Sequence, residues 1–272
     1  MLIQLPPGRR SLLRVLQRNA DTTCFPANVR LVISEPVSMK NITMYFKPAL
    51  RKRTLFNVVG VLPGKTQPEE WILITAHYDH VGVLKKRRDS IFNGANDNAS
   101  GTAAMMMLAR YYAARRNNNR GIIFIGFAGE EIGLVGSRYF AHNSSRLNIK
   151  AVVNLEMLGK PHREGHRVCM VTGGGDLPSW FRNTAVDSGI KIGYDERPEQ
   201  RLFRRSDNYP FFLKGIPAHT FMNWVDNDRD YHQPSDELST LDLGNMCELV
   251  KGLIPGLDGL ISGEFTPHVT GE

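Results

Sequence analysis

Histidine and carboxylate side chains gather in two short segments of this 272-residue chain. The first, A-H-Y-D-H, places His77, Asp79 and His80 directly after the almost wholly apolar run 71–76. The second, N-G-A-N-D-N-A-S-G, supplies Asp97 in a turn of glycine, asparagine and serine. Imidazole and carboxylate groups without thiolates are typical ligands of zinc, manganese or cobalt in catalytic sites. A single His-x-Asp is weak evidence, so the places of the other ligand-type residues decide whether the chain holds a metal site.

Four predicted strands are each followed by an acidic or imidazole side chain. Strands are expected over 71–76, 121–128, 151–155 and 218–222, and the side chains after them are His77, the pair Glu130 and Glu131, Glu156, and His232. Ligands of open α/β sheets bind beyond the carboxyl ends of the strands. One such side chain alone would be read as a surface charge, but their shared place at strand ends favours one common site.

The elements that must position these side chains alternate between strands and helices. Helices are predicted over 99–116, 136–142, 177–188 and 241–260, with a short one over 206–213. This alternation is typical of a sheet with helices on both faces. We therefore predict an α/β fold: a single three-layer domain over 51–272, with a mostly parallel, mixed central sheet flanked by helices.

Residues 1–50 are expected to be an N-terminal lead-in, with a short helix over 11–19 and strands over 29–33 and 42–46. The sequence leaves open whether this is the remnant of a longer segment. Its start, M-L-I-Q-L-P-P-G-R-R, lacks the apolar core of a secretory signal. No apolar run approaches the roughly 18 residues of a membrane span. The protein is therefore expected to be intracellular or to lack its natural N-terminus here, and its location stays open.

Composition excludes several classes of protein. A hydrophobic content of 42% is sufficient for one large α/β domain. Cys24, Cys169 and Cys247 are an odd number without C-x-x-C spacing, which argues against a disulfide framework and a thiolate zinc site. The net charge of +7 comes from scattered basic residues without a nucleic-acid motif, so we expect no nucleic-acid partner.

Residues 60–66 read G-V-L-P-G-K-T and resemble a phosphate-binding loop. The segment is one residue short of the required spacing. Its Pro63-Gly64 pair is typical of a turn that closes the predicted strand 55–62. We expect a hairpin turn here and no phosphate site.

The number of ligand candidates bears on the number of metal ions. The candidates are His77, Asp97, Glu131, Glu156 and His232. Five ligands exceed what one catalytic zinc with an open position needs. They fit two ions that share a bridging carboxylate, about 3.5–4 Å apart. The H-E-x-x-H helix of mononuclear zinc peptidases is absent from the sequence.

The chain resembles the di-zinc aminopeptidases, whose relatives include glutamate carboxypeptidase II and the glutaminyl cyclases. The resemblance runs from about residue 55 to 262 and rests on five motifs in the family's order: A-H-Y-D-H, N-G-A-N-D-N-A-S-G, F-A-G-E-E-I-G-L-V-G-S, N-L-E-M-L-G and Y-H-Q-P-S-D. It implies two zinc ions, with manganese or cobalt as substitutes, and a peptide substrate with a free N-terminus. Members are often secreted or periplasmic. Oligomeric state is not implied.

The resemblance also implies a role for each residue. His77 and Glu156 would bind one ion, Glu131 and His232 the other, and Asp97 would bridge them. The catalytic residues would be Glu130 as general base, Asp79 as the carboxylate that orients His77, and Tyr231 as an oxyanion stabiliser. A packed loop aromatic remains the alternative for Tyr231.

Two positions depart from the family pattern. Glu156 stands where the family usually has Asp, so an extra methylene must be accommodated and the choice of metal is in doubt. The family's S-D-H is S-D-N here, with Asn208 at the third position. Glu130 and Glu156 are the candidates to meet the free amine of an aminopeptidase substrate.

Three other functions stay open on this scaffold. A carboxypeptidase could grip a substrate carboxylate through Arg201, Arg204 or Arg205. A glutaminyl-cyclase-like acyltransferase is the second, and a non-enzymatic receptor ectodomain is the third. A receptor would be expected to have lost metal ligands, and all five positions are filled here. We favour an aminopeptidase, which hydrolyses peptide bonds, over these three functions.

Overall fold

A computed structural model describes residues 2–4, 31–33, 52–84, 89–195, 198–223 and 228–269. The chain divides into two compact units, Met1–Thr54 and Leu55–Glu272. In the first unit, strands β1 (Leu2–Gln4) and β2 (Leu31–Ile33) pair in parallel. The second strand lies within the strand predicted over 29–33. The helix predicted over 11–19 and the strand predicted over 42–46 lie outside the described residues.

The second unit is built around a seven-stranded sheet with the order β10-β9-β11-β8-β4-β7-β3. Its strands are β3 (Val58–Leu62), β4 (Gln67–His77), β7 (Arg120–Phe127), β8 (Asn148–Glu156), β9 (Val168–Val171), β10 (Lys191–Tyr194) and β11 (Ala218–Met222). The neighbouring pairs are parallel except β3 with β7 and β9 with β11. This confirms the predicted mixed, mostly parallel sheet.

Strand β4 lies inside the sheet because its side chains are apolar on both faces. Ile72 and Ile74 pack with one hydrophobic cluster, while Leu73 packs with the other, and all three are fully buried. A strand covered on both faces reads as a continuous apolar run, which is how 71–76 appears in the sequence. Its central position carries His77, the last residue of β4, to the carboxyl edge of the sheet.

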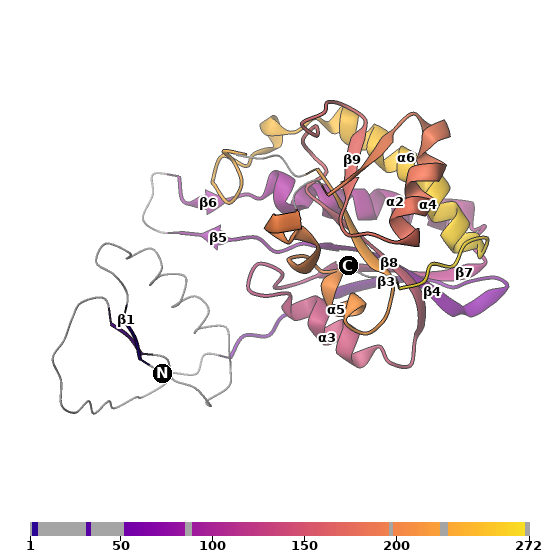
Figure 1. Cartoon of the computed structure of the whole chain (residues 1–272), viewed down its shortest axis with the longest axis horizontal. Helices are drawn as coiled ribbons and strands as arrows, with labels where there is room; N and C mark the ends of the chain where they lie inside the picture. The colour runs from indigo at the N-terminus through magenta and orange to yellow at the C-terminus, as the bar shows by residue number, and fades with distance from the viewer. Residues whose placement is uncertain are drawn as a thin grey trace. The chain divides into compact units, whose positions relative to one another are not determined.

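Helices cover both faces of the sheet, as predicted (Figure 1). The helices α2 (Gly101–Arg115), α4 (Asp176–Ala185) and α6 (Leu243–Ser262) contribute to the cluster that contains Ile72. On the other face, α3 (Val135–Asn143) and α5 (Tyr209–Phe212) contribute to the cluster that contains Leu73. Two layers of helices thus hold the sheet rigidly enough to position side chains at its edge.

The connection between β3 and β4 is a turn, but it does not close a hairpin. Residues 63–66 join the two strands, yet β3 and β4 pair with opposite sides of β7. The predicted hairpin is therefore wrong, since β3 crosses to the far edge of β7. The turn itself is packed, because a Cβ on Gly64 would lie 2.4 Å from the backbone oxygen of Asn119.

Shorter elements complete the unit. Strands β5 (Gly82–Val83) and β6 (Ile91–Phe92) pair beyond the end of β4, and the helical segment η1 (Ala95–Ser100) leads into α2. The 3-10 turns are η2 (Val186–Ser188), η3 (Pro198–Gln200), η4 (Leu202–Arg204) and η5 (Leu238–Thr240). Among the helices of the described residues, none has the length and apolarity to cross a membrane.

Candidate metal centre

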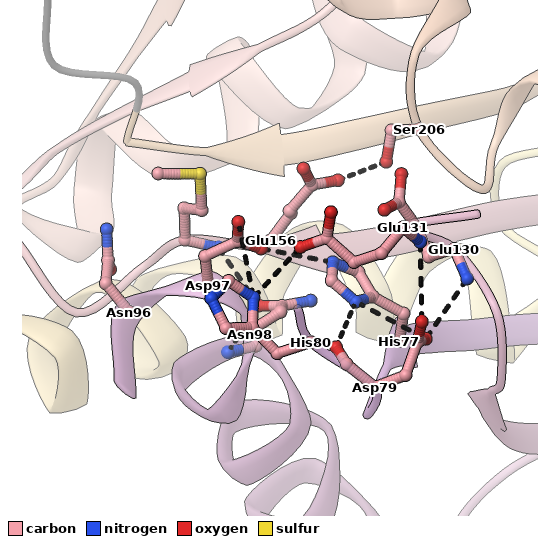
Figure 2. Close-up of polar contacts among 12 residues, drawn as sticks. His77, Asp79, His80, Asn96, Asp97, Asn98, Glu130, Glu131, Glu156 and Ser206 are labelled. Atoms are coloured by element: carbon pink, nitrogen blue, oxygen red, sulfur yellow. Dashed lines mark hydrogen bonds and ion pairs between the residues drawn. The ribbon is translucent and has the colours of Figure 1, made fainter. Parts of the chain in front are cut away.

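The candidate site lies at the carboxyl edge of the sheet, where five segments meet, and Figure 2 labels site residues from β4, η1, the loop after β7 and β8. Strands β4 and β8 end there in His77 and Glu156. The other segments are η1, the loop after β7 and the loop after β11, which carry Asp97, the glutamate pair and His232. The candidate residues therefore lie together at the carboxyl edge of the sheet, where the strand-end rule expects ligands to bind.

Asp97 is held by a loop whose polar side chains replace regular backbone pairing. The carboxylate of Asp236 accepts hydrogen bonds from the backbone amides of Asn96 at 2.9 Å and Asp97 at 3.0 Å. The Asn96 side chain accepts one from the amide of Gly159 at 2.9 Å, and the Asn98 side chain accepts one from the amide of Met157 at 3.1 Å. These bonds explain why the segment is rich in asparagine, and they leave the Asp97 carboxylate free to face the site.

The two oxygens of Asp97 face different histidines. Oδ1 lies 3.4 Å from Nε2 of His77, and Oδ2 lies 3.1 Å from Nε2 of His232. Oδ2 also lies 3.8 Å from Nδ1 of His80. The side chain is 4% exposed, so it is nearly removed from solvent. A carboxylate in this position is suited to bridge two cations.

Glu131 faces two of the same histidines. Its Oε1 lies 2.9 Å from Nδ1 of His80 and 3.1 Å from Nε2 of His232. One ligand atom from each of His80, Asp97, Glu131 and His232 lies within 4.8 Å of the others. Three of these four residues were predicted as ligands from the sequence. His80 was noted as a ligand-type side chain and received no role.

A buried network of polar side chains holds the Glu156 carboxylate in place. The hydroxyl of Ser206 donates a hydrogen bond to Oε2 of Glu156. Ser206 in turn accepts a hydrogen bond from Asn154 at 2.8 Å, and its hydroxyl oxygen lies 3.1 Å from that of Thr220. Asn208 accepts a hydrogen bond from Thr220 at 2.9 Å, so the third residue of S-D-N belongs to this network. The longer glutamate side chain therefore reaches a fixed position, with one oxygen engaged by a hydroxyl.

Glu130 and Glu131 leave the end of β7 in a loop that Asp79 organises. The Asp79 carboxylate accepts hydrogen bonds from the backbone amides of Glu130 at 3.1 Å and Glu131 at 3.4 Å. Nδ1 of His77 lies 3.1 Å from the backbone carbonyl of Asp79 and 3.8 Å from its carboxylate. Asp79 thus contacts His77 mainly through its backbone and contacts the glutamate loop through its side chain. Thr102 donates to the carbonyl of His77 at 2.8 Å and fixes the strand end.

Tyr231 lies beside the metal ligand candidates. Its ring stacks on that of His232 with a centroid separation of 4.0 Å. The guanidinium of Arg205 donates to its hydroxyl at 3.5 Å. Burial raises the pKa of Tyr231 above its ordinary value, so the hydroxyl stays protonated and can donate. Tyr231 is therefore a candidate donor at the rim of the site as well as a packed aromatic.

The site concentrates negative charge under burial, and this perturbs its titration. Burial, followed by the negative charge of Glu156, raises the pKa of Glu130 to about 9. Burial also raises the pKa of Glu156 to about 7, against the opposing effect of His77. Burial raises that of Asp97 too, but its contacts with His232 and His77 outweigh this and hold the pKa of Asp97 well below its usual range. Perturbed carboxylates of this kind mark functional sites.

The residues present fit divalent metal ions in two respects. First, Nε2 of His77, both ring nitrogens of His80 and Oε1 of Glu131 are buried and have no hydrogen-bond partner. Unsatisfied buried polar atoms are rare and call for a ligand or ion. Second, two divalent ions would bring four positive charges to a site that gathers five carboxylates, those of Asp79, Asp97, Glu130, Glu131 and Glu156. The donor set of imidazoles and carboxylates suits zinc.

The structure thus brings together all eight residues predicted for the site, and it adds three that sequence reasoning did not assign. Those three are His80, Ser206 and Asp236. All three stand inside motifs already noted, at positions whose contacts depend on loops. Their proximity to the site could be expected from the motifs, but their partners could not.

Comparison with known proteins agrees with this geometry. The sequence matches the profile of peptidase family M28 over residues 57–254. It is 29% identical over 208 residues to aminopeptidase YwaD of Bacillus subtilis, a match that covers 73% of this chain and 43% of that protein. It is 40% identical over 230 residues to a probable zinc metalloprotease of Leptosphaeria maculans, covering 71% and 52% respectively. The chain therefore spans about half the length of these relatives.

The fold is shared with solved aminopeptidase structures. The LapA aminopeptidase of Legionella pneumophila aligns with a TM-score of 0.62 at 26% identity, over 76% of this chain and 56% of that one. The part of this chain that the family profile covers contains every residue of the candidate site. The protein therefore belongs to peptidase family M28.

Proposed function

We propose that the protein is a zinc-dependent aminopeptidase that holds two zinc ions and releases residues one at a time from the amino ends of peptides. The observation that carries the proposal is the position of Asp97, whose two oxygens face His77 on one side and His232 on the other. A carboxylate shared in this way is the central feature of two-metal hydrolase sites. The zinc metalloprotease and aminopeptidase relatives support the choice of metal and reaction.

In this proposal each ion has its own ligands besides the shared Asp97. His77 and Glu156 would hold one ion, and Glu131 and His232 would hold the other. Divalent ions in such a site acidify water and polarise the scissile carbonyl. Side chains of the protein would carry out the proton transfers and stabilise the oxyanion.

Glu130 is the proton carrier in this proposal. Its carboxylate stands beside the ligand Glu131, and the Asp79 carboxylate holds the backbone of both residues. Without metal, burial and the charge of Glu156 raise its pKa to about 9. The positive charge of two bound ions would favour the ionised carboxylate, which is the form that can accept a proton. It would take a proton from water and pass it to the leaving amine, as a general base and then a general acid. Tyr231 would donate its hydroxyl proton to the developing oxyanion.

A pair of peptides tests the aminopeptidase assignment. A peptide with a free amino terminus should be shortened one residue at a time from that end, followed by mass spectrometry. The same peptide with an acetylated amino terminus should resist, because the carboxylates of the site could no longer meet a cationic amine. Equal cleavage of both peptides, or release from the carboxyl end, would overturn this assignment. Release from the carboxyl end would instead support the carboxypeptidase alternative.

The zinc content tests the two-ion proposal separately. Gently purified protein should carry close to two equivalents of zinc by elemental analysis. Its activity should be lost to a chelator and regained on adding zinc. A single equivalent in fully active protein would contradict the two-ion proposal and favour a cyclase-like site.

A further inference from the structure

We infer that His80 is a fourth protein ligand of the ion held by Asp97, Glu131 and His232, so that the two metal positions are chemically unequal. This inference rests on the proposed function, because it assumes that divalent ions bind at this site. The residue roles that the family resemblance implies give His80 none, and its assignment comes from geometry alone.

The distances around His80 match those expected for ligands of one ion. Zinc bonds to nitrogen and oxygen of about 2.0–2.2 Å separate the ligand atoms of a tetrahedral site by about 3.3–3.5 Å. Nδ1 of His80 lies 2.9 Å from Oε1 of Glu131 and 3.8 Å from Oδ2 of Asp97. The corresponding distances from Nε2 of His232 are both 3.1 Å. His80 therefore faces the same two carboxylate oxygens as His232, nearer to Glu131 and farther from Asp97.

A hydrogen-bonded ion pair between His80 and Glu131 explains these contacts less well. Nδ1 of His80 and Oε1 of Glu131 are 2.9 Å apart, yet neither atom has a hydrogen-bond partner. Their separation suits a hydrogen bond, but their directions do not. An ion among these ligand atoms, which lie within 4.8 Å of one another, would give both of them a partner. Figure 2 shows the side chains of His80, Asp97 and Glu131 facing one another.

The chain also makes room for this orientation of His80. The imidazole is 8% exposed and packs on Gly94. A Cβ at Gly94 would lie 2.6 Å from the His80 ring and 2.3 Å from the backbone oxygen of Asp97. Gly94 has φ 61°, a left-handed conformation that glycine adopts without strain. The absence of a side chain at Gly94 therefore allows the His80 ring to pack next to the loop that carries Asp97.

Unequal ligand sets predict unequal affinities. His80 would give one ion four protein ligands, while His77, Asp97 and Glu156 give the other ion three. Closed four-ligand sites are typical of tightly held zinc, and three-ligand sites keep a position open for chemistry. The ion at His80 should therefore be the last to leave under a chelator. The ion at His77 and Glu156, close to Glu130, should be the first.

Zinc titration of metal-free protein in competition with a chromogenic chelator tests the inference. Wild type should bind two ions with separate affinities. His80→Ala should weaken the tighter one by more than about 100-fold, beyond the 10–100-fold typical of residues that only orient a ligand. His77→Ala should weaken the other ion instead. His142→Ala removes an exposed histidine of α3 and should change neither affinity.

X-ray absorption of zinc-loaded wild type gives a second readout that needs no variant. Three imidazoles shared between two ions are expected, against two if His80 is not a ligand. Two imidazoles in wild type, or a loss of 100-fold or less in a folded His80→Ala, would overturn the inference and leave the proposed function standing. Wild type that binds no zinc would overturn both.

Discussion

The carboxylate of Asp79 accepts a hydrogen bond from the backbone amide of Glu130 at 3.1 Å, and this contact ties the end of β4 to the loop after β7. The family resemblance implies that Asp79 orients His77. The structure places its carboxylate 3.8 Å from that ring and its backbone carbonyl 3.1 Å away. Asp79 can therefore serve both neighbours, with the carbonyl facing the histidine and the carboxylate facing the glutamates.

The first prediction separates proton transfer from metal binding. Glu130→Gln keeps the shape of the side chain and removes the base, so kcat should fall by about 10²–10⁴ while zinc content stays unchanged. Glu131→Gln is the matched variant at the next residue. It should lose one equivalent of zinc, and added zinc should restore part of its activity. Kinetics and elemental analysis on both proteins check this. Near-normal turnover in Glu130→Gln would remove its assigned role.

The second prediction concerns the loop that carries Asp97. Asp236→Asn replaces an acceptor of two backbone amides by a group that can accept at only one oxygen. Stability should fall by about 1–3 kcal/mol. Zinc affinity should fall by about 10–100-fold, because Asp97 is no longer held. Chemical denaturation and zinc competition measure the two effects.

Asp242→Asn is the control for that substitution. Asp242 caps α6 by accepting from the amide of Asn245 at 2.9 Å, and asparagine caps helices about as well. Its zinc affinity and stability should therefore match wild type. Equal zinc affinity in Asp236→Asn and Asp242→Asn would show that Asp236 does not position the metal ligand.

The third prediction concerns the glutamate that stands where the family usually has aspartate. Glu156→Asp should weaken zinc binding here, because the shorter side chain can no longer reach Ser206. Ser206→Ala should weaken it through the same contact. A double-mutant cycle in zinc affinity should therefore be non-additive by about 0.5–3 kcal/mol. Ser206→Thr should lose less zinc affinity than Ser206→Ala, because threonine keeps the hydroxyl. Additive effects would mean that the two residues act independently.

The fourth prediction concerns the stability of the metal-free protein between about pH 7 and pH 9. Glu130, with a pKa of about 9, keeps its proton in the folded state, while in the unfolded chain it is ionised above about 4.5. Burial opposes the protonated form of His232, but contacts with Asp97 and Glu131 outweigh it and raise its pKa to about 9. The folded state therefore binds more protons than the unfolded state, and stability must fall as pH rises through this range.

Calorimetry at several pH values checks this sign. The Tm of metal-free protein should decrease from pH 7 to pH 9, and the decrease should be smaller in Glu130→Gln, which lacks one titrating group. Zinc should remove the trend, because it binds ionised carboxylates and neutral imidazoles. A Tm that rises with pH in the metal-free protein would contradict the assigned protonation states.

The fold could be predicted where a stretch of sequence is apolar enough that it must be buried on both faces of a sheet. The runs that became β4, β7 and β8 are apolar along most of their length, and such runs are stable only inside a covered sheet. The ligand-type residues after these strands then followed from the rule that sites form at carboxyl ends. Those two physical arguments account for the sheet and for most of the site.

The remainder depends on contacts between segments far apart in the chain. Nothing in the Pro63-Gly64 turn states that β3 will pair with β7 instead of β4, because a turn determines direction and not partner. His80 and Asp236 lie in loops, where no repeating pattern of apolar and polar residues predicts the direction of a side chain. The role of Ser206 depends on the extra methylene of Glu156, which only the folded structure places beside it.

The spread of the ligands along the chain orders events during synthesis. His77 leaves the ribosome before His232, which follows β11, the last strand among the described residues. Long loops must close before such distant residues meet, and that closure is slow relative to forming a helix. The full set of proposed ligands can therefore assemble only after β11 has joined the sheet. Metal retention would accordingly report that translation and folding were both completed, which makes bound zinc a checkpoint for the finished domain.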